Sequence, residues 1–234
     1  MIIFYKRSII KSNEQINCND INIAVVLCKE VFGMKTETKR KIKDIFYKNK
    51  GYLRAKELSE EGIHRKYLSD LLEKGEIIKL KRGLYKWNDE NFNGINELVD
   101  VAKIIPDGVI CLTSALSYYE LTTYTPLEYQ IAIPNQKKIK NVTYPPINLY
   151  YFSEKYYKDG IIKEKIDGYN IKIYNIEKSI SDSFRYSYEI PKDILIESLK
   201  EYLSLPEKNL NKLLRYAQGT SAEDKISKYL EVLV

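Results

Sequence analysis

Three consecutive side chains in the first third of the chain suit contact with a nucleic acid. His64, Arg65 and Lys66 lie at the start of a segment, Ile63 to Lys74, whose apolar residues recur at helical spacing. The planar guanidinium of Arg65 can donate two parallel hydrogen bonds to guanine, so we expect Arg65 to read bases. We expect His64 and Lys66 to contact phosphate near the positive end of the helix, with Ser69 further along the outward face. The alternative is a solvated face on a structural helix.

Two further groups of cations suit contacts to phosphate or to the minor groove. One group lies in a predicted hairpin with a basic turn, and the other lies on the helix predicted to open the same segment. Such contacts hold the register of a protein on a duplex and carry little sequence information. If roughly 6 phosphates are paired per bound unit, a plot of log affinity against log salt should have a slope of about −5. The candidates are Lys79, Lys81 and Arg82 in the hairpin, and Lys39, Arg40 and Lys43 on the helix.

The net charge of +6 is unevenly distributed along the sequence. Residues 34–88, the basic segment, hold sixteen basic and eight acidic side chains, for a net +8. Residues 89–234 hold eighteen basic and twenty-one acidic side chains, for a net −3, and residues 1–33 contribute +1. A compact basic unit joined to a slightly acidic one indicates a polyanionic partner for the basic unit alone.

The pattern of the basic segment predicts a winged helix-turn-helix domain. Three helices are followed by two short strands around Gly83, which can adopt the positive φ of a tight turn. Gly62 supplies the turn between the second and third helices. The predicted helices span 36–50, 54–61 and 63–74, and the predicted strands span 76–80 and 84–87.

The remainder of the chain predicts a mixed α+β domain that ends in a helical bundle. The polar, turn-rich residues 89–94 indicate a linker, and residues 1–33 form an N-terminal extension to which no role is assigned. Met34 directly precedes the basic segment, which suggests the hypothesis that translation can begin there. In residues 95–234, the C-terminal part, strands come first and helices afterwards, which favours an α+β fold. Strands are predicted at 109–112, 129–133, 147–152, 161–166 and 169–174, and helices at 95–105, 114–121, 177–187, 192–204, 207–218 and 222–233.

Composition argues against a membrane protein, a disulfide scaffold and a metal site. The longest apolar run, Ile23 to Cys28, is far too short to span a bilayer, and no secretion signal is present. The three cysteines include no C-x-x-C pair, and a single histidine cannot build a histidine-rich metal site. We therefore expect a cytoplasmic protein with neither metal nor cofactor.

No arrangement of residues predicts catalysis. Ser114 and Ser117 have no general base nearby in sequence, and the chain lacks a G-x-x-x-x-G-K phosphate loop. It also lacks a Gly-Ser segment followed by Asp-x-Asp. Glu177 and Asp182 are expected to satisfy backbone amides at a helix start or to pair with Arg185, rather than to act as a catalytic pair. We expect the protein not to be an enzyme.

Several short motifs follow one another along the chain: Ala55-Lys56-Glu57-Leu58, Gly62-Ile63, Arg82-Gly83-Leu84-Tyr85, Leu112-Thr113-Ser114-Ala115-Leu116, Tyr129-Gln130-Ile131-Ala132-Ile133-Pro134 and Glu177-Lys178-Ser179-Ile180-Ser181-Asp182. In this order they resemble a known family, the AbiE-type abortive-infection antitoxins (the AbiEi family). The resemblance covers about residues 36 to 230, and each motif alone is unspecific. His64 departs from the family pattern, because a Ser or Thr helix cap would be usual there, so the start of the third helix is expected to be shifted or poorly capped.

The resemblance implies the antitoxin half of a type IV toxin–antitoxin pair that acts in abortive phage infection. In that family the winged helix represses its own operon by binding inverted repeats in promoter DNA, where oligomerisation can occur. The C-terminal domain serves repression and antitoxicity against a nucleotidyltransferase toxin, without expected direct binding. Two alternatives stay open: a winged-helix transcriptional regulator without a toxin partner, and a protein–protein adaptor.

Overall fold

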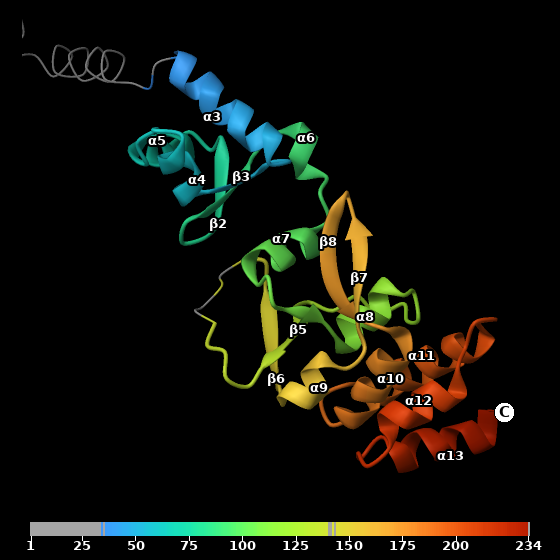
Figure 1. Ribbon diagram of the computed structural model, residues 1–234. Coiled ribbons are helices and arrows are strands. Elements are labelled where there is room, and N and C mark those ends of the chain that lie inside the picture. The colour runs from blue at the N-terminus through green and yellow to red at the C-terminus, as the bar shows by residue number, and fades with distance from the viewer. Residues whose placement is uncertain (1–33, 35, 140–141, 143, 234) are drawn as a thin grey trace, which may run out of the picture.

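The computed structural model describes residues 34, 36–139, 142 and 144–233 (Figure 1). The expected N-terminal extension, 1–33, which bears on the hypothesis of a translation start at Met34, lies outside the described residues. The mixed α+β architecture is confirmed, with helices and two sheets in the described ranges.

The basic segment folds into three helices around a three-stranded antiparallel sheet. Its sheet has the strand order β1-β3-β2, and Trp87 on the central strand packs against Phe46 with ring centroids 5.1 Å apart. Ile42, Leu58 and Leu71 bring one face of each helix into the same core. Strand β1 was not predicted, because three residues are too few to show an alternating pattern. The elements are α3 (Thr36–Lys48), β1 (Tyr52–Arg54), α4 (Ala55–Glu60), α5 (Lys66–Glu73), β2 (Ile77–Lys81) and β3 (Leu84–Trp87).

Residues 89–94 are ordered against the first helix rather than forming an irregular linker. They contain the short helix α6 (Glu90–Asn93), whose N-cap Asp89 accepts a hydrogen bond from the backbone amide of Asn91. Asp89 also accepts a 2.6 Å hydrogen bond from the hydroxyl of Tyr47 on α3. These contacts hold the start of the C-terminal part close to α3.

The C-terminal part is built on a five-stranded mixed sheet with the order β6-β5-β4-β8-β7. Strand β4 is antiparallel to β5 and parallel to β8, β5 is parallel to β6, and β7 is antiparallel to β8. Helix α9 was not predicted. The elements before the final helices are α7 (Glu97–Ile104), β4 (Val109–Ile110), α8 (Leu112–Tyr118), β5 (Tyr129–Pro134), β6 (Ile147–Phe152), α9 (Glu154–Lys158), β7 (Ile161–Ile166) and β8 (Tyr169–Tyr174).

Four helices follow the last strand and pack together at the end of the molecule opposite the basic segment (Figure 1). The first of them, α10, contacts the other three and α8, and all its residues from Glu177 to Phe184 are buried. The C-terminal part therefore has its own apolar core, to which Tyr174, Leu199 and Leu213 contribute. The helices are α10 (Ile176–Arg185), α11 (Lys192–Ser204), α12 (Leu210–Ala217) and α13 (Glu223–Leu233).

The basic segment and the C-terminal part share a second apolar core. Tyr52, Leu80 and Leu84 of the small sheet pack in one cluster with residues of the C-terminal part that include Ile104 and Ile171. Burial of apolar side chains is the main favourable contribution to association between folded units. The two regions are therefore docked against each other and not merely tethered.

Candidate nucleic-acid interface

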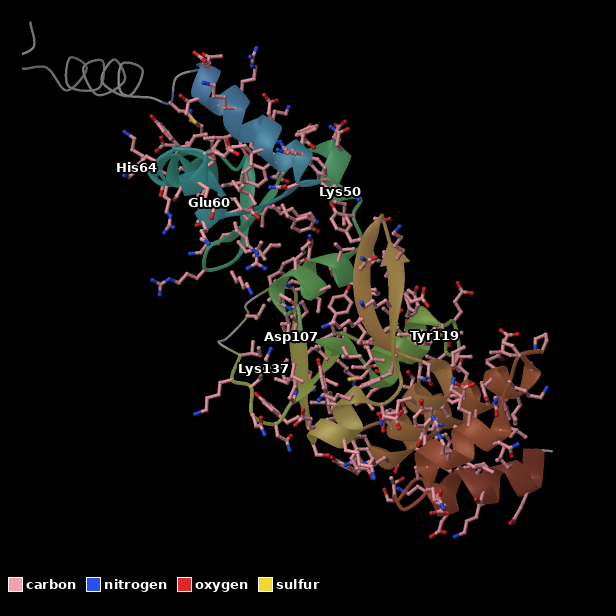
Figure 2. The ribbon with its side chains drawn as sticks, viewed as in Figure 1. Lys50, Glu60, His64, Asp107, Tyr119 and Lys137 are labelled. Atoms are coloured by element: carbon pink, nitrogen blue, oxygen red, sulfur yellow. The ribbon has the colours of Figure 1, made fainter. Side chains whose placement is uncertain are left out.

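Helix α5 has a buried face and a polar exposed face. Leu68 and Leu71 point into the core of the basic segment. The candidate residues His64, Arg65, Lys66 and Ser69 are all exposed. Figure 2 places His64 at the outer edge of the basic segment, on the side away from the C-terminal part. This surface is therefore open to a partner.

The start of α5 explains why a histidine can replace the usual cap. The helix begins at Lys66 rather than at Ile63, and Arg65 occupies the N-cap position with a helical φ of −60°. The imidazole Nδ1 of His64 accepts a 3.1 Å hydrogen bond from the backbone amide of Lys66. The start of the helix is therefore shifted from the predicted Ile63 to Lys66. The His64 ring accepts a hydrogen bond from one of the free backbone amides at the helix start, as a serine or threonine cap would do.

Arg65 also links the two helices that flank the turn. Its Nε donates a 2.9 Å hydrogen bond to the hydroxyl of Ser59 near the end of α4. No other hydrogen bond to the Arg65 side chain is found within the described part of the chain. Since a guanidinium has five N–H donors, its terminal nitrogens stay available for an acceptor outside the protein.

The three candidates in the β2–β3 hairpin differ in their surroundings. Lys79 and Arg82 are exposed. Lys81 is half-buried, and its ammonium donates a 2.5 Å hydrogen bond to the carbonyl of Ile104 at the end of α7. Burial, aided by nearby Arg54, lowers the pKa of Lys81 from its usual value. Lys81 therefore lies at the contact with the C-terminal part, while its two neighbours remain on the open surface.

The candidates on α3 divide in the same way. Arg40 is exposed, and Lys43 is exposed with its ammonium 5.2 Å from the ring centroid of Tyr47. Lys39 is half-buried and forms a 2.8 Å ion pair with Glu76, which precedes β2. The structure thus places Arg40 and Lys43 on the surface and pairs Lys39 within the basic segment.

A buried polar network between β1, β3 and α7 was not predicted. The carboxylate of Asp100 accepts a 2.5 Å hydrogen bond from the Tyr52 hydroxyl and a 2.9 Å one from the Lys86 ammonium. The Lys86 and Asp100 side chains are 7% and 5% exposed, so each requires the other as a partner. Burial and the hydrogen bond to Asp100 raise the pKa of Tyr52 well above its usual value. The sequence does contain a sign that Lys86 is buried. Lys86 is two residues from Leu84 in a predicted strand, so the two side chains share a face, and the Leu84 side chain is buried.

The β7–β8 hairpin makes a second contact with the basic segment. The Lys50 ammonium donates a 3.1 Å hydrogen bond to the carbonyl of Gly168 in the hairpin turn, and the Tyr169 hydroxyl donates to the carbonyl of Lys50. The ring of Tyr169 lies edge-on to that of Tyr52, with centroids 5.4 Å apart. Figure 2 shows Lys50 at this junction. The two contacts together fix the direction in which α5 faces relative to the C-terminal part.

The carboxylates of α10 pair differently from the expectation stated above. Asp182 forms a buried ion pair with Lys178, at 2.7 Å, and not with Arg185. Glu177 forms a 2.8 Å ion pair with Lys212 on α12. The helix start is capped by Asn175, which accepts from the amide of Lys178. The expected partners of these carboxylates, backbone amides or Arg185, are therefore wrong. Helix α10 is buried, and its two carboxylates pair with lysines instead.

Other candidate chemical groups take part in packing. The Ser114 hydroxyl accepts a hydrogen bond from the amide of Gln130, and burial raises the pKa of the Cys111 thiol. Among the described residues, no group of three or more histidine, cysteine, aspartate or glutamate side chains could hold a metal ion. None of the described helices has the length and apolar composition needed to cross a membrane.

Comparison with known proteins supports a regulatory role for the basic segment. Residues 40–85 match the model of a family described as transcriptional regulators, AbiEi antitoxin. The fold is similar to the crystal structure of the RV2827C protein from Mycobacterium tuberculosis, with a TM-score of 0.65 and 13% sequence identity. That similarity covers 85% of this chain and 77% of the other. No curated protein matches the chain.

Proposed function

We propose that this protein is an antitoxin and transcriptional regulator that binds promoter DNA through the basic segment. The family match over residues 40–85 supports an antitoxin or regulator role. The observation that carries the DNA-binding proposal is the exposed start of α5. His64, Arg65 and Lys66 are all exposed, and His64 lies on the side of the basic segment away from the C-terminal part (Figure 2). A basic helix start that is exposed in this way can enter the major groove of a duplex.

In the proposed complex the basic segment acts as a winged helix-turn-helix domain. Helix α5 enters the major groove, and the terminal guanidinium nitrogens of Arg65 donate to a guanine edge. Lys66 and the positive end of α5 lie near phosphate, and Lys79 and Arg82 of the hairpin contact the adjacent backbone. Arg40 and Lys43 on α3 add phosphate neutralisation. Lys81 and Lys39 take no part, since both ammonium groups are already paired within the chain.

The cellular role that we propose is neutralisation of a toxin together with repression of the operon that encodes both proteins. The resemblance of the motifs described above suggests a type IV system in abortive phage infection, with a nucleotidyltransferase as the toxin and inverted repeats as the operator. We propose that the protein acts in the cytoplasm, without a cofactor and without catalysis of its own. The C-terminal part, capped by the helices α10–α13, would supply the antitoxin function.

A gel-shift titration on the DNA upstream of the gene tests the DNA-binding proposal. Replacing Arg65, Lys79 and Arg82 by alanine should weaken binding at least tenfold, because a bidentate base contact contributes about 1–3 kcal/mol and phosphate contacts add to it. The matched control replaces three exposed lysines of the C-terminal part, Lys155, Lys163 and Lys165, by alanine. Equal binding by the Arg65 variant and the control would refute the assigned surface.

Co-expression with the toxin tests the antitoxin proposal separately. The gene beside this one, if it encodes a nucleotidyltransferase, is expressed alone and together with this chain in a sensitive host. Restored growth supports the antitoxin role, and unchanged toxicity refutes it while leaving the regulator role intact. An intact gel shift in the second case would favour a transcriptional regulator without a toxin partner.

A further inference from the structure

A groove lies between α11 and α13, at the far end of the molecule from α5 (Figure 1). Its volume is about 490 Å³, and its lining combines lysines with apolar side chains. The spacing explains the lining, because residues four apart on α11 and three or four apart on α13 fall on one face of each helix. The lining residues are Ile196 and Lys200 of α11 and Lys225, Lys228, Tyr229 and Val232 of α13.

The cations of the groove are not neutralised by the rest of the described chain. Lys200 and Lys228 are exposed, and neither takes part in an ion pair among the described residues. Lys225 donates hydrogen bonds to the Ser187 hydroxyl, at 2.6 Å, and to the Phe184 carbonyl, at 3.5 Å, and these neutral acceptors do not cancel its charge. Three positive charges around a small hollow favour an anionic occupant.

The apolar side chains of the groove distinguish between two kinds of anionic partner, a nucleic acid and an acidic protein segment. Val232 is 82% exposed, although it is a valine on an ordered helix. The ring of Tyr229 packs against the ring of Phe184 on α10, with centroids 5.8 Å apart, and this contact holds Tyr229 in place. A nucleic acid backbone would satisfy the lysines but would leave Ile196 and Val232 uncovered. A protein segment with carboxylates on either side of an apolar side chain would satisfy both.

We propose that this groove docks an acidic amphipathic segment of a partner protein. The segment presents an apolar anchor to Ile196, Tyr229 and Val232. Its carboxylates pair with the exposed Lys200 and Lys228, and the positive charge of Lys225 adds to the attraction. Because the groove and α5 lie at opposite ends of the chain, the partner can bind while α5 is engaged elsewhere. The proposal is independent of the DNA-binding proposal, since it uses none of the same residues.

The test measures binding of a fluorescein-labelled helical peptide of about 18 residues to the full chain by anisotropy. The peptide carries leucines along one face, at helical spacing, and glutamates elsewhere. A first control peptide has serine in place of every leucine, and a second has lysine in place of every glutamate. The protein variant is Lys200→Glu with Lys228→Glu, and its matched control is Lys163→Glu with Lys165→Glu on the exposed side of β7. All four positions are exposed, so circular dichroism should show both variants folded.

We expect the leucine–glutamate peptide to bind the wild-type chain and to shift the methyl NMR signals of Ile196 and Val232. Binding should weaken at least tenfold for Lys200→Glu with Lys228→Glu and less than twofold for the matched control. Both control peptides should bind at least tenfold more weakly. Absence of peptide binding, equal binding of the serine peptide, or equal binding by both protein variants would overturn the proposal. A loss of operator DNA affinity in Lys200→Glu with Lys228→Glu would assign the groove to nucleic acid and overturn it as well.

Discussion

The outer end of α5 and the junction with α7 use lysines and arginines of the same segment in opposite ways. At α5 the side chains of Arg65 and Lys66 are exposed, beside His64, which lies on the side away from the C-terminal part (Figure 2). At the junction Lys81 and Lys86 turn inward and donate to Ile104 and Asp100. The net charge of the basic segment is therefore larger than the positive charge available to a partner, because some of its lysines are paired with groups of the C-terminal part.

The largest expected effect is a loss of stability when the Asp100 carboxylate is removed from the junction. Asp100→Ala leaves the buried Lys86 ammonium without a partner, so the free energy of unfolding should fall by roughly 3–5 kcal/mol. Chemical denaturation monitored by circular dichroism measures the change. Asp100→Leu combined with Lys86→Met should recover most of it, because no buried charge remains. A stable Asp100→Ala variant would mean that Lys86 reaches solvent in solution.

At the open surface the largest effect should be on binding and not on stability. Arg65→Ala should weaken operator binding by about 1–3 kcal/mol and relax the preference at one base position, since the bidentate contact is lost. Arg65→Lys should restore little, because an ammonium cannot make the paired contact. Gel-shift titrations against a set of single-base operator variants measure both quantities. A uniform loss across all operators would instead assign Arg65 to phosphate.

The junction should also respond to alkaline pH through Tyr52. Burial, with the hydrogen bond to Asp100, holds the pKa of Tyr52 above its usual 10.0. The unfolded chain therefore ionises this tyrosine first, so its contribution to stability is complete below pH 10 and falls above it. The free energy of unfolding of wild type should fall more steeply than that of Tyr52→Phe between pH 10 and 11, by up to about 1.4 kcal/mol per pH unit. Parallel curves would show that Tyr52 ionises freely in the folded protein.

The smallest effects on DNA binding are expected for replacement of single cations in the β2–β3 hairpin. They should differ between the neighbouring residues Lys81 and Arg82. Arg82→Ala should reduce the slope of log affinity against log salt by about 1, as expected for one lost phosphate contact. Lys81→Met should leave that slope unchanged, because its ammonium already donates to Ile104 within the chain. Gel shifts at several salt concentrations measure the slopes. Equal slopes for the two variants would contradict the assignment of Arg82 to the DNA-binding surface and of Lys81 to the junction.

Much of the fold could be predicted because it depends on local patterns. Helix α11 and strands β3, β6, β7 and β8 have the predicted bounds, since hydrophobic periodicity and turn residues act over a few neighbours. Strand β1 and helix α9 were missed. Each is short and is held by its neighbours, β1 by pairing with β3 and α9 by packing on β5 and β6. Contacts of that kind leave no periodic trace in the sequence.

The candidate site was predictable in composition and not in detail. His64, Arg65 and Lys66 could be identified as polar residues near the start of a helix from their types and their position after Gly62. The structure begins that helix only at Lys66. Lys81 could not be separated from Arg82, because both lie in the same polar turn and only the approach of α7 distinguishes them.

By itself, the sequence determined that a basic unit of helices and a hairpin precedes a near-neutral α+β part, since charge and periodicity are properties of the chain. Only the tertiary structure decided which cations stay free for a partner. Asp100 and the carbonyl of Ile104 come within hydrogen-bonding distance of Lys86 and Lys81 only after the two regions share a core. Desolvation and pairing act between residues that are distant in sequence, so no local pattern records them.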